Sequence, residues 1–338
     1  MSLAVQLEQD LSVHGVAVRF GSAVADHFAR LTLDYEPFFV PAATREPVSS
    51  DADPLTFAVD FEDPGEKRPT DKLIAGSLGD TVVLAEDGSV RVFGPAIDDQ
   101  RAYKEEIRAY LTATVLRRLV TTRGAQQFHA SAVEGGRGAV LFAGAKKMGK
   151  TSMALLSTLG GASYMSNDIT LLSLADQVAV LGLPQPLTVG LGAVNWFATR
   201  RPESGLDRSR IDGGLTDHQL YNLEIDDKQE LTRSAIVRLG CGVKDGPAPL
   251  SSIVFPEPNL SLDRPRIRLL ARDEAMTRLA MLAEAFLKWE WPVALGADAY
   301  FDRMREVVSA AVEQADCYHF QWCPDHDRNL DLLRGTVL

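Results

Sequence analysis

Cysteine is scarce in this chain of 338 residues, which has three, at positions 241, 317 and 323. So small and odd a number does not suit the disulfide framework of a small secreted domain. Positive charge is also in short supply, because 35 lysines and arginines stand against 46 acids and leave a net charge of −11. This balance argues against a surface for nucleic acid or anionic membrane, since both need clustered positive charge.

Long apolar runs are missing as well. No stretch of the sequence approaches the ~18–20 apolar residues that a membrane-spanning helix needs. The first residues include Glu8 and Asp10 and lack the basic and apolar segments of a signal peptide. We therefore expect a cytoplasmic protein without a membrane or nucleic-acid partner. A composition of 46% hydrophobic and 24% charged residues is that of a soluble globular protein.

The first hundred residues predict a β-rich region. A strand is expected at Leu55–Phe61, within a stretch rich in proline and acids. Two further strands, Thr81–Leu84 and Val90–Phe93, flank a Glu-Asp-Gly turn that is typical of a hairpin. A helix should follow at about Tyr103 to Thr122, because apolar residues recur there every four positions.

Residues 101–338 predict an α/β domain that follows the N-terminal region 1–100. The expected strands are Phe128–Val133, Ala139–Ala143, Ala162–Ser166, Ile169–Leu174, Val178–Leu181 and Ser252–Phe255, and the expected helices are Lys150–Leu159, Asp273–Lys288 and Ala299–Gln314. The strand Ala139–Ala143 is short and fully apolar, as buried parallel strands tend to be.

A phosphate-binding pattern follows that apolar strand. A glycine, four free positions and then Gly-Lys-Thr are present as Gly144, Ala145, Lys146, Lys147, Met148, Gly149, Lys150 and Thr151. The glycines let the backbone approach phosphate closely, and successive N–H groups form an anion-binding nest. A helix that begins at Lys150 adds its positive end. The lysine would reach the β- and γ-phosphates, and Thr151 would bind Mg²⁺.

A transfer reaction also needs a group that accepts a proton, and the phosphate loop does not supply one. Asp168 is the candidate, because it follows the expected strand Ala162–Ser166. Strand ends on one side of a parallel sheet converge on a ligand crevice. From its position alone, Asp168 is explained equally well by a turn that it forms with Asn167.

The segment Phe128–Leu172 resembles the catalytic core of the HPr kinase/phosphorylase family and its related kinases. The resemblance rests on His129 before the loop, on the loop itself and on the Asn-Asp pair that ends at Asp168. It implies a P-loop α/β fold similar to phosphoenolpyruvate carboxykinase, with ATP and Mg²⁺ as cofactors. In that family's pattern, Lys150 would bind phosphate, and Thr151 and Asp168 would bind Mg²⁺. Asp168 would also accept the proton, oriented or tuned by His129.

The chain departs from the family at three places. Asn167 stands where the family has the first of two aspartates, so the coupling between adjacent carboxylates is missing. Leu187 occupies the position of a glutamate that binds Mg²⁺, just before a Gly-Leu-Gly stretch similar to the family's. The signature that engages HPr is not evident in residues 252–338. The resemblance therefore favours a kinase and argues against HPr as its acceptor.

We expect an ATP-dependent kinase that transfers the γ-phosphoryl group to an alcohol hydroxyl, with Asp168 as base. A serine in a peptide or protein and a small metabolite, such as a nucleoside, a sugar or a natural-product intermediate, are equally good acceptors at this point. The alternatives are a nucleotide-binding regulator or ATPase without a kinase acceptor, and a degenerate scaffold that binds nucleotide weakly. The sequence leaves the oligomeric state open, a homo-oligomer included.

Two clusters outside this segment have simpler explanations than a site. Four potential zinc ligands lie within ten residues, namely Cys317, His319, Cys323 and His326. The aromatic residues among them alternate as on a strand, which favours core packing over a metal site. Arginines at positions 200, 201, 208 and 210 would suit an anionic group, but the acids among them favour a solvated, mobile loop.

Overall fold

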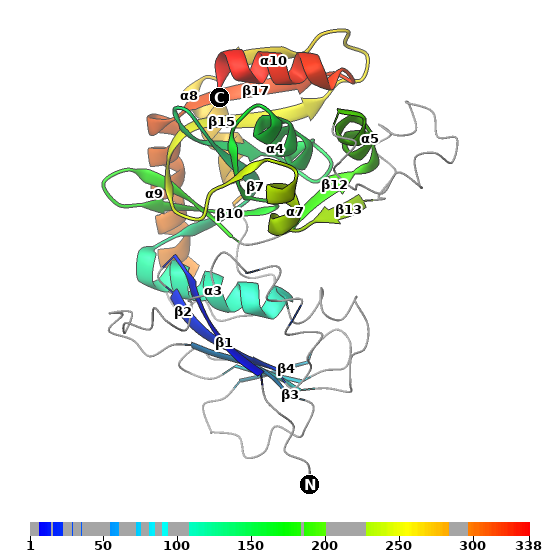
Figure 1. Ribbon diagram of the computed structural model, residues 1–338. Helices are drawn as coiled ribbons and strands as arrows, with labels where there is room; N and C mark the ends of the chain where they lie inside the picture. Colours follow the sequence, from blue (N-terminus) through cyan, green and yellow to red (C-terminus); the bar gives the residue numbers. More distant parts are fainter. Residues whose placement is uncertain are drawn as a thin grey trace. The chain divides into compact units, whose positions relative to one another are not determined.

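The computed structural model describes residues 7–14, 16–22, 29, 35, 55–60, 72–75, 81–84, 90–93, 108–183, 186–200, 228–283 and 297–338. The chain forms two compact units, Met1–Arg123 and Gly124–Leu338 (Figure 1). The division falls after the helix that the sequence assigned to the main domain, so this helix lies in the first unit. Among the described helices, none has both the length and the apolar character needed to cross a membrane.

The first unit is a mixed sheet with one described long helix. Its strands follow the order β1-β2-β3-β6-β5-β4. Their bounds are Leu7–Val13, Val16–Ser22, Leu55–Asp60, Lys72–Ala75, Thr81–Leu84 and Val90–Phe93 for β1 to β6, and the helix α3 is Arg108–Arg123. The predicted strand near residue 55 and the predicted hairpin of β5 and β6 are confirmed. The hairpin of β1 and β2 was not predicted.

The second unit is built on a large mixed sheet. In the part of the chain that the structure describes, the sheet has nine strands: eight follow the order β14-β9-β7-β10-β11-β15-β17-β16, and the ninth, β8, pairs with both β7 and β15. The bounds are Gln126–Gly135 (β7), Gly138–Ala143 (β8), Ser163–Ser166 (β9), Ile169–Leu174 (β10), Val178–Gly182 (β11), Gly242–Val243 (β14), Ala248–Pro258 (β15), Arg266–Leu269 (β16) and Asp316–Trp322 (β17). The α/β class predicted for this domain is confirmed.

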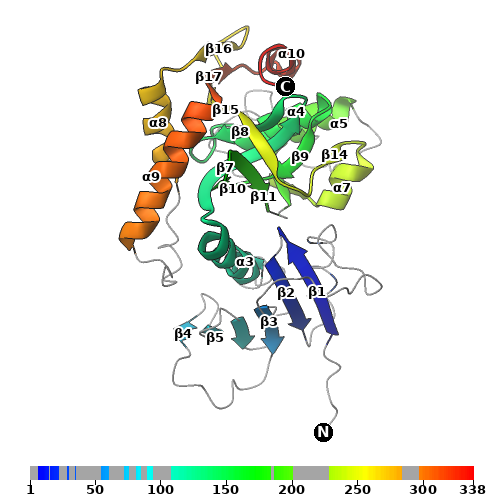
Figure 2. The same cartoon turned by 90° about the vertical axis from the view of Figure 1, so that its left-hand side faces the viewer.

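Helices cover both faces of this sheet. They are α4 (Lys150–Leu159), α5 (Leu191–Arg200), α7 (Arg233–Arg238), α8 (Arg272–Ala280), α9 (Ala297–Gln314) and α10 (His326–Thr336), and a small separate sheet joins β12 (Leu187–Gly190) to β13 (Lys228–Leu231). Figure 2 shows α8 and α9 on one side of the large sheet and α4 and α5 on the other. Each side has its own apolar core.

Strand β8 is apolar throughout because both of its faces are buried. Val140 and Phe142 point into the core that α4, α5, α7 and α10 cover. Ala139, Leu141 and Ala143 alternate with them and point into the core beneath α8 and α9. All five side chains have a relative exposure of 0%. The prediction from the apolar run is confirmed: β8 is a buried strand, and it has a parallel neighbour, β15.

Strand direction brings distant segments to one end of the sheet. Strands β8, β15 and β17 are parallel to one another. Strand β7 is antiparallel to both β8 and β9, so β9 runs in the same direction as β8. The residues that follow β8, β9 and β17 therefore emerge at the same end. The expected convergence occurs, but in a mixed sheet, in which the antiparallel strand β7 lies between β8 and β9.

Two stretches differ from the prediction. Helix α8 ends at Ala280, well before the predicted end at Lys288, because the chain turns and Ala283 forms an isolated bridge with Phe128 of β7. After Pro184, where the sequence showed no clear pattern, the chain forms β12 and α5. The predicted mobile loop begins at Arg200, which ends α5, and its remaining residues lie outside the described part of the chain.

Candidate functional site

The loop between β8 and α4 has the backbone that its glycine pattern requires. Gly149, directly before α4, has a φ of 97° and lies in the left-handed region. A side chain at this position would also collide, because a Cβ atom on Gly149 would lie 2.6 Å from Nε1 of Trp322. Lys147 is left-handed too, with a φ of 69°. Glycine at 149 is therefore required both by conformation and by close packing.

Lys150 folds back over this loop. It is the first residue of α4, and its side chain is buried, with a relative exposure of 4% for the residue. Its Nζ donates a hydrogen bond to the carbonyl oxygen of Ala145, at 2.9 Å. A buried ammonium group and the positive end of a helix thus occupy the same small volume. This combination favours an anion.

A buried amide joins the loop helix to β7 and β9. The side-chain oxygen of Asn167 accepts hydrogen bonds from the hydroxyls of Thr151, at 2.7 Å, and Ser131, at 3.0 Å. The amide nitrogen of Asn167 donates to Oδ2 of Asp168, at 3.3 Å. Asn167 is only 1% exposed. Thr151, Asn167 and Asp168, which the sequence placed in two separate motifs, therefore form one hydrogen-bonded chain.

This geometry gives a physical reason for asparagine at position 167. An aspartate there could accept from the same two hydroxyls, but it could not donate to Asp168. It would also put a second negative charge beside that carboxylate, and neighbouring like charges raise each other's pKa. The amide lets Asp168 keep its position without a charged neighbour at 167.

Asp168 lies in a turn and faces His129. Its φ of 58° is left-handed, which asparagine and aspartate tolerate better than most residues. The backbone N–H of Ile169 donates to the carbonyl oxygen of Asn167, at 2.7 Å. Nε2 of His129 is 3.7 Å from Oδ1 of Asp168, and the two side chains are 26% and 45% exposed. The turn with Asn167, which the sequence offered as one explanation for Asp168, is therefore present, and Asp168 also faces His129.

The sequence missed two residues of this site. Ser131 contributes a hydroxyl to Asn167 from the middle of β7. Trp322, at the end of β17, donates from its indole Nε1 to the carbonyl oxygen of Met148 in the loop, at 2.9 Å. In the sequence, 174 residues separate Trp322 from that loop residue. No spacing pattern connects residues so far apart, so only the sheet topology could reveal this contact.

Position 187, where the sequence has leucine in place of a Mg²⁺-binding glutamate, offers no metal ligand. Leu187 is fully buried on β12, in the apolar core beneath α4. The four potential zinc ligands near the C-terminus are dispersed: Cys317 belongs to the core under α8 and α9, and His319 lies 2.5 Å from Glu257. Across the described residues, no group of three or more His, Cys, Asp or Glu side chains is placed to hold a metal.

The ring of His326 packs between the indole rings of Trp322 and Trp196. Its ring centre lies 6.3 Å from that of Trp322 and 5.7 Å from that of Trp196, which it meets edge-on. The guanidinium carbon of Arg200 lies 4.4 Å from the ring centre of Trp196, and Nε of Arg200 donates a hydrogen bond to the carboxylate of Asp327 on α10. Burial, together with the nearby charge of Arg200, lowers the pKa of His326 to about 4. The imidazole is therefore neutral at physiological pH, packed between two indoles.

No known family model matches this sequence, and a search of curated proteins finds no relative.

Replacing Trp322 with phenylalanine should lower the free energy of unfolding by about 1–3 kcal/mol, because the partly buried carbonyl of Met148 loses its donor. Urea denaturation of the whole chain measures this change. Trp196→Phe is the matched control, because the Trp196 indole N–H is buried and makes no hydrogen bond within the described part of the chain. Equal losses in the two variants would contradict a specific role for the Trp322 hydrogen bond.

His326 should make the fold sensitive to acid. Its pKa is about 4 in the folded protein against an ordinary 6.5. The unfolded chain therefore binds a proton first, and stability falls as the pH drops from about 6.5 to about 4, by about 3 kcal/mol in total. Urea denaturation at several pH values should show a shallower loss in His326→Gln than in the wild type. Identical pH slopes would contradict this assignment.

Proposed function

We propose that this protein is an ATP- and Mg²⁺-dependent kinase with an HPr-kinase-like P-loop core, which transfers the γ-phosphoryl group to an alcohol hydroxyl. One observation carries the proposal. Lys150 and the start of α4 close a glycine-dependent loop, and Asn167 links Thr151 of that helix to the accessible carboxylate of Asp168. A phosphate-binding element and a candidate base thus lie two hydrogen bonds apart.

The loop would hold the nucleotide through its backbone and Lys150. Its N–H groups, the helix N-terminus and the ammonium group together compensate the charge of the β- and γ-phosphates. The hydrogen bond from Lys150 to Ala145 holds the ammonium group over the loop before a nucleotide arrives. Such preorganised positive charge stabilises the transferring phosphoryl group without further reorganisation.

Mg²⁺ fits the oxygen atoms at the loop helix. Thr151 and Asp168 offer a hydroxyl and a carboxylate within one hydrogen-bonded chain, and Mg²⁺ prefers oxygen ligands while keeping several waters. When bound, the ion would neutralise charge on the phosphates. Leu187 is too buried and apolar to add a ligand, so waters and phosphate oxygens would complete the coordination.

Asp168 is the proposed base for the acceptor hydroxyl. Its side chain is 45% exposed, so an acceptor can reach it from solvent. His129 lies close enough to orient this carboxylate. The hydrogen bond from Asn167 orients the other carboxylate oxygen. A carboxylate held on both sides can take the hydroxyl proton as the phosphoryl group is transferred.

A nucleotide-binding regulator or ATPase without an acceptor is the second candidate. The burial of Leu187 favours it, because the site then has fewer protein ligands for Mg²⁺ than the family pattern provides. The two functions differ in one measurable respect. The regulator hydrolyses ATP at a rate that no added alcohol or peptide changes, whereas the kinase transfers the label to an acceptor.

Lys150→Ala should abolish nucleotide binding. MgATP at about 100 times its Kd should stabilise the wild-type protein by about 2.7 kcal/mol, and this gain should vanish in the variant. Thermal unfolding with and without MgATP measures the difference. Lys244→Ala is the control, because this lysine pairs with Glu134 at the protein surface. A full MgATP shift in Lys150→Ala would remove the basis of the proposal.

Asp168→Asn should still bind MgATP, through the loop backbone, Lys150 and Thr151, but lose transfer, with kcat reduced by at least about 100-fold, as expected for the loss of a general base. The assay follows the label of γ-labelled ATP into a panel of serine peptides, nucleosides and sugars. Binding is checked separately by thermal unfolding, so that a folding defect is not mistaken for a catalytic one. Unchanged turnover in Asp168→Asn would show that another group accepts the proton.

A further inference from the structure

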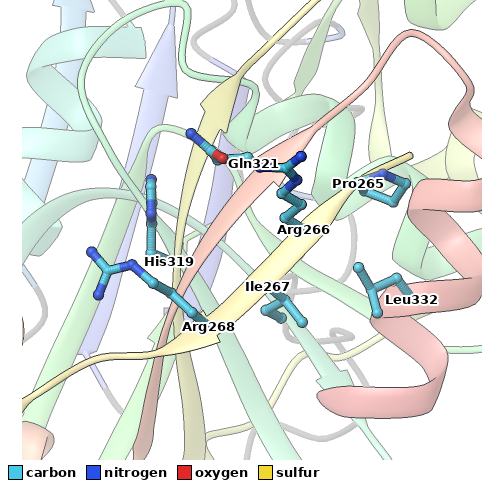
Figure 3. A pocket seen from close by; sticks show the side chains of 7 residues that line it. All are labelled: Pro265, Arg266, Ile267, Arg268, His319, Gln321 and Leu332. Atoms are coloured by element: carbon cyan, nitrogen blue, oxygen red, sulfur yellow. The ribbon is translucent and has the colours of Figure 1, made fainter. Parts of the chain in front are cut away.

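A groove follows the edge strand β16, away from the phosphate loop. It has a volume of about 700 Å³ and is lined by residues of β16 and β17 and by Leu332 of α10 (Figure 3). The groove is open to solvent, and the surface around it includes Leu269, which is 63% exposed.

Strand β16 has a free edge. It pairs with β17 through the register Arg266–Gln321 to Leu269–Tyr318, and among the described strands it has no second neighbour. The backbone N–H and C=O groups of such an edge are available to an added strand. Extended peptides bind other domains in this way, with affinity from the backbone and specificity from alternate side chains.

The two faces of β16 differ in chemistry. Arg266 lies beside Gln321 and Arg268 beside His319 on one face, whereas Ile267 points to the other face, toward Leu332 (Figure 3). A strand added at this edge would have its side chains alternate in the same way. Acidic side chains would then meet the arginines, and apolar side chains would meet Ile267 and its neighbour.

Two arginines at this edge carry positive charge that no described acid pairs with. Of the arginines at positions 264, 266, 268 and 272, Arg268 is held by two hydrogen bonds to Glu274, and Arg272 pairs with Glu313. Arg264 and Arg266 are exposed and form no ion pair with any described residue. In a chain whose net charge is −11, these two charges would attract an acidic segment.

We propose that the edge of β16 docks an extended segment of a protein acceptor, in which acidic and apolar residues alternate. This inference rests on the proposed kinase function and narrows its acceptor class. A small metabolite has no use for a strand edge, whereas a polypeptide can bind there and present a serine at the loop. The docking segment and the phosphorylated serine are then separate parts of one chain.

The sheet sets the distance between docking and chemistry. Val254 of β15 pairs with Phe142 of β8 on one side and with Tyr318 of β17 on the other. Measured along the strand direction, the groove therefore lies at the same height as the phosphate loop, which follows β8, although several strands separate the two. The path from β16 to β9, which precedes Asp168, crosses five strand spacings, or about 24 Å at ~4.8 Å each. An extended linker of about seven residues, at ~3.3 Å per residue, spans this distance.

Peptide binding to the full-length protein tests the docking site. A fluorescein-labelled peptide of alternating Glu and Leu is titrated by anisotropy, beside a peptide with the same residues in two blocks and one with Lys in place of Glu. We expect the alternating acidic peptide to bind best. Arg266→Glu should weaken binding of the alternating acidic peptide at least about tenfold, because an attractive charge pair is lost and a repulsive one is gained. The same variant should improve binding of the Lys peptide.

Arg238→Glu is the matched control, since Arg238 is an exposed arginine on α7 and the charge change is the same. Equal weakening by both variants, equal binding of the block peptide, or no binding of any peptide would overturn the docking site. MgATP-induced stabilisation is measured on the same samples. If that stabilisation persists while docking fails, only the docking inference falls. If peptide binds but MgATP has no effect, the kinase proposal falls instead.

Discussion

The hydrogen bonds to the side-chain oxygen of Asn167 are the interaction on which the site depends. That oxygen is buried and accepts from Thr151 on α4 and from Ser131 on β7, so it joins three elements at one end of the sheet. A buried acceptor left without a donor costs about 1–3 kcal/mol. Both hydroxyls are therefore held in place, and with them the first turn of the loop helix and the turn that presents Asp168.

The phosphate loop is supported from a second direction. Trp322 holds the carbonyl of Met148, and its ring approaches Gly149 so closely that only glycine fits. Behind it, His326, Trp196 and Arg200 pack in succession, linking α10 and α5 to the loop. The conformation of the loop is thus determined by contacts from the end of the chain as well as by its own glycines. This arrangement favours a preformed anion site.

The proposed base and the proposed docking edge occupy opposite parts of one sheet. Asp168 follows β9, and β16 forms the far edge beyond β17. Separating the two would let the docking segment determine which protein is modified, while the residues around Asp168 carry out the transfer. Linking two contacts within one polypeptide raises the effective concentration of the serine, provided that the linker spans the gap. Under the proposed function, acceptor choice would then depend on linker length as well as on local sequence.

Several elements were predictable because their signals are local. The apolar run of β8 and the bounds of α4 were predicted correctly, as were the hairpin β5–β6 and the strands β10 and β11. Glycine, turn residues and hydrophobic periodicity act over a few residues, so they can be recognised in a short stretch of sequence. Helix α8 was predicted too long because a bridge from Ala283 to β7, which no periodicity reports, ends the helical stretch.

The sequence by itself determined the phosphate-loop motif, the neighbouring strand and helix, and the candidates His129 and Asp168. Only the tertiary structure decided that Asn167 joins Thr151 to Asp168, that Trp322 supports the loop, and that Leu187 is buried in the core. It also decided that β16 is an edge. These facts depend on which strands pair and in which direction. Such pairings form between residues far apart in the chain, so no local pattern records them.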